Sequence, residues 1–366
     1  MEYRRIGDYI KEVDSRNRDL KITKLVGLTI NKAFIPSVAN VIGTDLSSYK
    51  VIQKEQFACS LMQVSRDGKM PVAMFEEDEA IMSPAYPMFE VIDKDVLLPQ
   101  YLMMWFSRSE FDREASFYAV GGVRGSLTWE DFCNMKLPVP SVDRQREIVE
   151  EYETLSRRIC LNEQIIEKLE ATAQALYRKM FVDGIDKENL PEGWRMGTLS
   201  EVAVLKAGGD KPIDFSEIKT ETYNVPVYAN GIDNKGIFGY TIKSVIKAKS
   251  ITISARGTIG YCFLRKEPYV PIVRLIVVAP HDEIMAQYIY HYLDSSDIKG
   301  SGSVQSQLTV PDMEGMDILI PPYQSVKDFN DKVEIMDKSI SIYEQENSKL
   351  SELQSLLLAK MGNLKQ

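Results

Sequence analysis

Histidine, paired cysteine and long apolar runs are scarce in this chain of 366 residues. It has two histidines, four widely separated cysteines and no Cys-x-x-Cys pair. These absences exclude the usual spacing of a zinc site and favour unpaired thiols in a reducing compartment. No stretch approaches the roughly 18 apolar residues of a membrane-spanning helix, and the first residues lack the apolar core of a signal peptide. We therefore expect a cytoplasmic protein without a metal site.

Residue patterns that would indicate an enzyme are missing as well. Ile320-Pro321-Pro322-Tyr323 resembles the Asp/Asn-Pro-Pro-Tyr box of amino-methyltransferases. That box needs an amide or carboxylate at its first position to accept hydrogen bonds from the target amine, and isoleucine cannot accept them. Gly208-Gly209-Asp210-Lys211 lacks the spacing of a phosphate-binding loop. No set of nucleophile, base and orienting group is recognisable, so we predict no catalytic residue in this chain.

The charge of the chain is unevenly distributed. Its net charge of -9 argues against a nucleic-acid ligand, since contacts to phosphates dominate such affinity. Residues 74–95 are rich in Asp and Glu, whereas residues 243–266 contain Lys and Arg and no acidic residue. An acidic body with a local basic strip is compatible with DNA binding. It suggests that a partner helps to hold the duplex.

The chain repeats itself. Leu127-Thr128 matches Leu308-Thr309 at an offset of 181 residues, and the same offset continues without a gap to Lys179-Met180 and Lys360-Met361. Upstream the offset changes: Gln100-Tyr101 matches Gln287-Tyr288 at 187, and Ser65 with Gly68 matches Ser254 with Gly257 at 189. A constant offset downstream and a changing one upstream indicate a tandem duplication, with variable loops that precede an invariant element.

Each invariant element is predicted to be one long helix. Apolar residues follow alternate steps of four and three over residues 148–180 and again over residues 329–361. This spacing of 3.5 is typical of a coiled-coil seam, and each segment would extend about 50 Å. The polar residues Asn162, Asn347 and Gln354 also lie on the seam, where such residues fix the register. The predicted apolar seam consists of Ile148, Leu155, Ile159, Ile166, Leu169, Leu176, Val333, Met336, Ile340, Leu350 and Leu357.

We predict an α+β fold with two tandem globular domains and two long helices that pack as an antiparallel coiled coil with pseudo-twofold symmetry. The globules would cover residues 1–142 and 184–323, and the helices residues 143–183 and 324–366. The alternative is a coiled coil that dimerises and carries unrelated globular ends.

Polar loops next to predicted strands are the candidates for contacts with DNA. Arginine can bind guanine, and Gln or Asn adenine, with two hydrogen bonds in the major groove. Arg256, Gln305 and Gln307 are predicted to read bases, while Lys206, Lys211 and Lys249 hold phosphates. The full candidate set consists of Ser65, Arg66, Lys69, Arg124, Ser126, Lys206, Lys211, Asn230, Lys249, Ser254, Arg256, Gln305 and Gln307. Duplicated places carry different residues, with Arg124 opposite Gln305 and Ser126 opposite Gln307, as expected if the halves read different sequences.

Two segments resemble the specificity subunit of type I restriction–modification enzymes. They are Leu137-Pro138-Val139-Pro140 with the following residues 143–149, at the first helix entry, and residues 190–195, at the start of the second globule. The second helix entry departs from the family pattern, because Val326 replaces the usual Gln. The resemblance, together with the twofold arrangement, covers nearly the whole chain.

That resemblance implies that each globule is a target-recognition domain that reads one half of a split site in double-stranded DNA. The two helices would act as a spacer and dock two methyltransferase subunits, which bind S-adenosylmethionine and methylate adenine. Motor–nuclease (restriction) subunits, where present, would add ATP-dependent cleavage. S-adenosylmethionine, ATP and Mg are therefore expected in partner subunits, with no cofactor in this chain.

Two other functions are compatible with the sequence. A stand-alone adenine methyltransferase would bind S-adenosylmethionine as an isolated chain. A coiled-coil adaptor without DNA specificity would retain no particular duplex, even with its partner subunits present.

Overall fold

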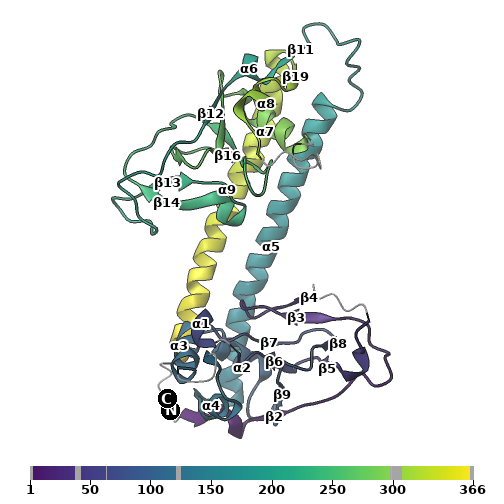
Figure 1. Ribbon diagram of the computed structural model, residues 1–366, viewed down its shortest axis with the longest axis vertical. Coiled ribbons are helices and arrows are strands. Elements are labelled where there is room, and N and C mark those ends of the chain that lie inside the picture. The colour runs from purple at the N-terminus through teal and green to yellow at the C-terminus, as the bar shows by residue number, and fades with distance from the viewer. Residues whose placement is uncertain are drawn as a thin grey trace. The chain divides into compact units, whose positions relative to one another are not determined.

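The computed structural model describes residues 3–37, 43–62, 64–120, 125–296, 298 and 307–362. It divides into two compact units, the first made of Met1–Asn162 with Glu344–Gln366 and the second of Glu163–Tyr343. Each unit contains one globule and parts of the two long helices, α5 (Val142–Phe181) and α9 (Tyr323–Met361) (Figure 1). Among the described residues, no helix is long and apolar enough to cross a membrane.

The globule of the first unit is built around an antiparallel sheet of four strands in the order β2-β9-β6-β7. Smaller pairs, β3-β4, β5-β8 and β1-β10, surround it. The strands are β1 (Tyr3–Arg5), β2 (Ile10–Glu12), β3 (Val26–Leu28), β4 (Phe34–Pro36), β5 (Lys50–Gln53), β6 (Phe57–Cys59), β7 (Val72–Met74), β8 (Glu79–Met82), β9 (Met88–Val91) and β10 (Lys136–Pro138). The helices are α1 (Val64–Asp67), α2 (Pro99–Phe106), α3 (Ser109–Tyr118) and α4 (Trp129–Asn134), with short 3-10 turns at Ile6–Asp8 and Leu46–Ser48.

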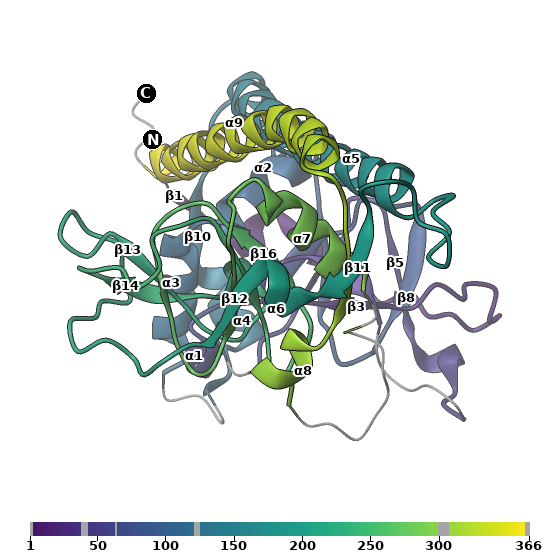
Figure 2. The same cartoon turned by 90° about the horizontal axis from the view of Figure 1, so that it is seen from above.

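The globule of the second unit has a corresponding four-stranded sheet in the order β12-β18-β15-β16. A three-stranded sheet, β14-β13-β17, extends away from the long helices (Figure 2). The strands are β11 (Arg195–Thr198), β12 (Ala203–Ala207), β13 (Val225–Tyr228), β14 (Ile237–Thr241), β15 (Ser250–Ile253), β16 (Cys262–Arg265), β17 (Val270–Pro271), β18 (Ile276–Pro280) and β19 (Asp317–Ile320). The helices are α6 (Leu199–Val202), α7 (Met285–Ser295) and α8 (Val310–Glu314), with a 3-10 turn at Asp233–Gly236.

The two globules share their organisation, which confirms the predicted duplication. In each, the strand that precedes a long helix pairs antiparallel with the first strand of its globule, β10 with β1 and β19 with β11. The repeated Leu-Thr segment starts a short helix in both, because the hydroxyl groups of Thr128 and Thr309 accept a hydrogen bond from the third residue of α4 and α8. The buried hydroxyl groups of Tyr101 and Tyr288 donate to the equivalent carbonyl oxygens of Pro138 and Leu319.

One predicted correspondence is wrong. Ser60 donates its backbone N–H across the β6–β7 hairpin to Pro71, as Ser254 does to Tyr261 across the β15–β16 hairpin. The counterpart of Ser254 is therefore Ser60 and not Ser65. The backbone N–H groups of Leu127 and Leu308 then bind the equivalent carbonyl oxygens, those of the residues that follow these serines. The hairpin loops differ in length, so an alignment by residue type alone slipped by five positions.

The two long helices pack antiparallel, as predicted. Within the first unit, Asn162 Nδ2 lies 2.8 Å from Asn347 Oδ1, and Gln354 Nε2 lies 2.7 Å from the Ser156 hydroxyl, so residue numbers rise along α5 as they fall along α9. Every predicted apolar seam residue is buried or half-buried. Each unit has its own core, which includes Ile148 and Met361 in the first unit. The core of the second unit includes residues of both helices as well.

Candidate nucleic-acid interface

Asn230, in the loop between β13 and β14, joins two other segments of the second globule by hydrogen bonds: the turn between β17 and β18 and the loop between β15 and β16. Its Nδ2 donates to the carbonyl oxygen of Val273, at 2.8 Å, and its Oδ1 accepts from the backbone N–H of Ala255, at 2.7 Å. The carbonyl oxygen of Ala255 accepts in turn from Leu308, at 3.0 Å. Both ends of the Asn230 amide are therefore engaged in holding loops together. We correct its predicted role from a contact with DNA to positioning of the loops.

Ser254 also proves to be structural. Its side chain is buried, its hydroxyl donates to the carbonyl oxygen of Thr258, and the same hydroxyl accepts from the backbone N–H of Tyr261 at 3.1 Å. These bonds close the loop between β15 and β16. A buried hydroxyl with two internal partners cannot reach a base edge, so the predicted DNA contact of Ser254 is wrong.

Arg256 stands at the exposed apex of that loop. Its Nε and Nη2 both donate to Oε1 of Gln307, at 3.0 and 2.7 Å. The structure thus brings together two residues that lie 51 positions apart and that were both predicted to contact DNA. Gln305 lies outside the described residues.

The loop that follows β12, residues 208–211, is packed tightly against the turn between β17 and β18. A Cβ atom on Gly208 would lie 2.8 Å from the backbone of Pro271, so only glycine fits there. Opposite it, Val273 and Arg274 have φ values of 53° and 59°. This left-handed conformation is strained for a β-branched residue and persists only where the surroundings enforce it. The hydrogen bond from Asn230 to the Val273 carbonyl oxygen helps to hold this conformation.

Arg265 supports the loop between β13 and β14, a role that was not predicted from the sequence. Its guanidinium stacks 3.5 Å from the ring of Tyr228 and donates to Thr252 Oγ1 and to the Lys235 carbonyl oxygen, at 2.9 and 2.6 Å. Burial lowers the pKa of this guanidinium. Burial likewise raises the pKa of the adjacent Tyr269 to about 12. A charged residue at the end of the otherwise apolar stretch 262–264 was the available signal.

The predicted phosphate-binding lysines lie in different surroundings. Lys206 is exposed on β12, and the ammonium of Lys211 lies 3.5 Å from the centre of the Phe215 ring. Lys249, in contrast, forms an ion pair of 3.1 Å with Glu334 on α9. Part of the basic strip therefore holds the globule to a long helix, and the phosphate contact of Lys249 stays a prediction.

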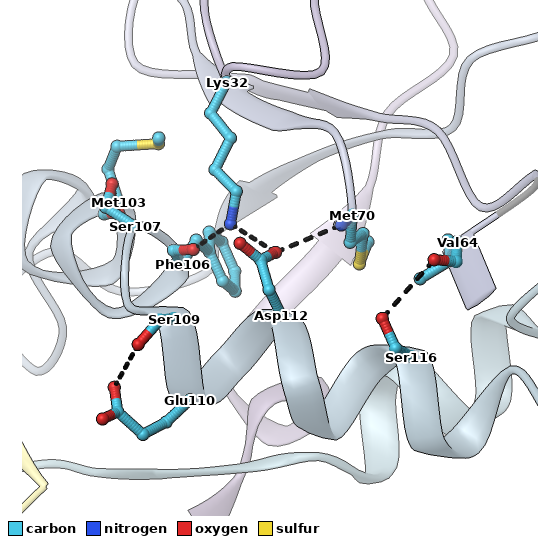
Figure 3. A network of polar contacts seen from close by, with 10 residues as sticks. All are labelled: Lys32, Val64, Met70, Met103, Phe106, Ser107, Ser109, Glu110, Asp112 and Ser116. Carbon is cyan, nitrogen blue, oxygen red and sulfur yellow. Dashed lines mark hydrogen bonds and ion pairs between the residues drawn. The ribbon is translucent and has the colours of Figure 1, made fainter. Parts of the chain in front are cut away.

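In the first globule, a buried ion pair positions the loop between β6 and β7 (Figure 3). Lys32 Nζ lies 2.8 Å from Asp112 Oδ1, donates to the carbonyl oxygen of Phe106 and lies 5.2 Å from the centre of the Phe111 ring. The same Asp112 oxygen accepts from the backbone N–H of Met70, at 3.1 Å. Burial lowers the pKa of Lys32, although Asp112 opposes this shift. Asp112 thus ties the β3–β4 hairpin and the end of the 64–70 loop to α3.

Residues 64–70 contain three of the five residues predicted for the first half, Ser65, Arg66 and Lys69. Ser65 Oγ lies 3.5 Å from the carbonyl oxygen of Gly125, so this loop and the segment that begins the Leu-Thr repeat lie together. Ser126 follows and is half-buried. Arg66 is exposed and pairs with Asp67 at 2.7 Å, and Lys69 is exposed. Arg124 lies outside the described residues.

Comparisons with known proteins agree with this arrangement. The family model described as the type I restriction modification DNA specificity domain matches residues 38–171 and again residues 191–353. A Mycoplasma pneumoniae protein named as a type I specificity subunit is 32% identical over 42% of this chain, but the match spans 45% of that protein's length. A second such protein of this organism is 34% identical, over 38% of its length.

Two further relatives cover nearly the whole chain. The HindI specificity subunit of Haemophilus influenzae is 21% identical over 92% of each chain. The crystal structure of a type I restriction–modification S subunit from Mycoplasma genitalium superimposes with a TM-score of 0.60 and 15% identity, over 98% of this chain and 95% of that one. This last likeness shows that the fold is shared.

Proposed function

Since this chain belongs to the family of type I restriction–modification DNA specificity domains, we propose that it is a non-catalytic specificity subunit that reads a bipartite DNA target and docks two methyltransferase subunits. The observation that carries the proposal is the duplicated frame with different exposed side chains. Ser60 and Ser254 are equivalent, so Met62 in one globule occupies the place of Arg256 in the other. The 181-residue offset also pairs Ser126 with Gln307. A shared frame with different side chains suits two different half-sites.

In this proposal residues 1–142 and 184–323 are the two target-recognition domains. Arg256 and Gln305 in the second domain, and Ser65, Arg124 and Ser126 in the first, contact base edges. Lys206, Lys211, Arg66 and Lys69 contact phosphates, which orient the domains without carrying sequence information. Asn230, Ser254 and Asp112 keep the loops in position, as their internal hydrogen bonds indicate.

A groove between α5 and α9 in the first unit is our candidate for the methyltransferase contact. It has a volume of about 600 Å³ and is lined by Leu155, Leu353, Leu356 and Leu357, with three glutamates and a lysine at its rim. Leu353 and Leu356 are 51% and 53% exposed. Exposed leucines beside acidic side chains suit a partner helix with an apolar face flanked by basic residues.

Exposed apolar positions also recur along the duplicated helices. The 181-residue offset pairs Leu161 on α5 with Ile342 on α9, and these side chains are 53% and 63% exposed. A repeated exposed apolar position favours a partner that binds in two copies. S-adenosylmethionine would be bound by these methyltransferase subunits, and ATP and Mg by restriction subunits where they are present.

Methylation mapping tests the proposal. We would sequence DNA from cells that carry this chain with its methyltransferase, and from the same cells after deletion of this chain. The expected result is a split motif with modified adenine that disappears on deletion. If the deletion leaves every methylated motif unchanged in an active system, the proposal fails and the adaptor function replaces it. Binding of S-adenosylmethionine by the isolated chain would instead support a stand-alone methyltransferase.

A further inference from the structure

The loop between β15 and β16 holds its apex residue in a defined place. The backbone N–H of Ala255 is bound by Asn230, at 2.7 Å, and its carbonyl oxygen by Leu308, at 3.0 Å. On the other side, Gly257 turns the chain back with a φ of 71°. Arg256, between these two residues, therefore starts from a fixed backbone and projects an exposed side chain.

The guanidinium of Arg256 is held in one orientation by Gln307. Nε and Nη2 share the amide oxygen Oε1 as acceptor, at 3.0 and 2.7 Å. No described residue engages the N–H groups of Nη1 or the second N–H of Nη2. One N–H of each of these two nitrogens lies parallel to the other at the end of the guanidinium, as a fork that matches two adjacent acceptors.

Guanine is the base that offers two adjacent acceptors, N7 and O6, in the major groove. Adenine offers one acceptor beside an amino donor, and cytosine offers a donor, so each would leave part of the fork without a partner. We propose that Arg256 selects a guanine in the half-site of the second globule and that Gln307 is its positioning residue. This inference rests on the proposed function and specifies the base that is read. It also replaces the predicted base contact of Gln307 by a contact with Arg256.

The first globule supplies a natural comparison. The equivalent residue, Met62, is 62% exposed and has no hydrogen-bond donor in its side chain. The residue equivalent to Gln307 is Ser126, which is too short to hold a guanidinium in this way. The first half therefore lacks this guanine reader at the corresponding place, and the two half-sites should differ there. Arg256→Met therefore places in the second globule the residue that the first globule has at the equivalent place.

The test compares the methylated motifs of variants of the full chain, each assembled with its methyltransferase. Libraries of duplexes would be methylated in vitro and sequenced for modified adenine. In Arg256→Met and Arg256→Lys, preference for guanine should fall by about ten- to one-hundred-fold at a single position, with the rest of the motif unchanged. Lysine keeps the charge but not the fork, so it should relax the same position. The matched control is Lys206→Gln, which should weaken all sequences alike.

Gln307 is tested by loss and rescue. Gln307→Ala should reduce the preference at that same position, while Gln307→Glu should restore it, because a carboxylate oxygen accepts from the same two N–H groups. A guanine that stays invariant in both Arg256 variants would overturn the inference, as would relaxation at a base other than guanine. Those results would leave the specificity role intact. Absence of any motif that depends on the wild-type chain would instead remove the proposed function itself.

Discussion

His291 shows how one buried residue couples the second unit to pH. Its imidazole lies on α7, 2.7 Å from Gln174 Oε1 on α5, and contacts the rings of Tyr177 and Phe329. Burial lowers its pKa to about 4, and the nearby carboxylates of Asp294 and Asp337 oppose this shift only in part. The ring is therefore neutral at neutral pH and joins α7 to both long helices.

We predict that His291 destabilises the protein in mild acid. As the pH falls below about 6.5, the unfolded chain binds a proton at this residue before the folded chain does, so stability is lost between about pH 6.5 and 4. The free energy of unfolding should decrease by about 2 kcal/mol from this residue between pH 7 and 5. His291→Met places there the residue found at the equivalent position 104, and it should remove this part of the pH dependence. Denaturant unfolding at pH 7, 6 and 5 measures it.

The exposed His281 provides the control. His281→Met should leave the pH dependence as it is in the wild type. An unfolding free energy that falls equally between pH 7 and 5 in the wild type and in His291→Met would contradict the assignment.

At the scale of single residues, the sequence identified which loops carry polar groups but not what those groups bind. Asn230, Ser254 and Lys249 were predicted to contact DNA, and all three have internal partners. The reason is general: the amides and hydroxyls that suit a base edge also satisfy the backbone N–H and C=O groups of a tight loop. Only the three-dimensional structure shows whether such a group binds a neighbouring segment of the chain. It shows this for Arg256 and Gln307, which are hydrogen-bonded to each other.

At the scale of elements, the long helices could be predicted because a period of 3.5 over more than four heptads is hard to obtain otherwise. The antiparallel packing followed from the duplication, and the bond between Asn162 and Asn347 now shows the register. The 181-residue offset pairs these two asparagines with Tyr343 and Ile166. The polar pair is therefore specific to one half, and one register is favoured over its shifted alternatives. Loop correspondence failed where hairpin lengths differ, as between Ser60 and Ser65.

The groove between α5 and α9 leads to a prediction about assembly. Leu353→Ala with Leu356→Ala should weaken binding of the methyltransferase subunit by about tenfold or more, because the partner would lose apolar contact area at the centre of the interface. Titration of the labelled chain with methyltransferase measures this change. The control is Ile335→Ala, which truncates an exposed apolar residue of the same helix, outside the groove. Equal affinities for the double variant and the control would exclude the groove as the docking surface.

At the scale of the whole molecule, both long helices pass from one compact unit into the other. The boundaries between the units fall after Asn162 on α5 and after Tyr343 on α9, which the 181-residue offset pairs. Because each globule packs on parts of both helices, we propose that the helix pair determines the gap between the two half-sites.

A matched insertion in both helices tests whether the helix pair determines this gap. Seven residues inserted after Asn162 and seven after Tyr343 keep the heptad pattern of the seam and lengthen each helix by about 10 Å. At 3.4 Å per base pair, the unread gap in the methylated motif should increase by about three base pairs. The half-site sequences serve as the internal control, since both globules are unaltered and should select the same bases. A motif with its original gap and both half-sites intact would show that the helices do not set the spacing. Loss of one half-site would instead place the insertion within the structure that supports that globule.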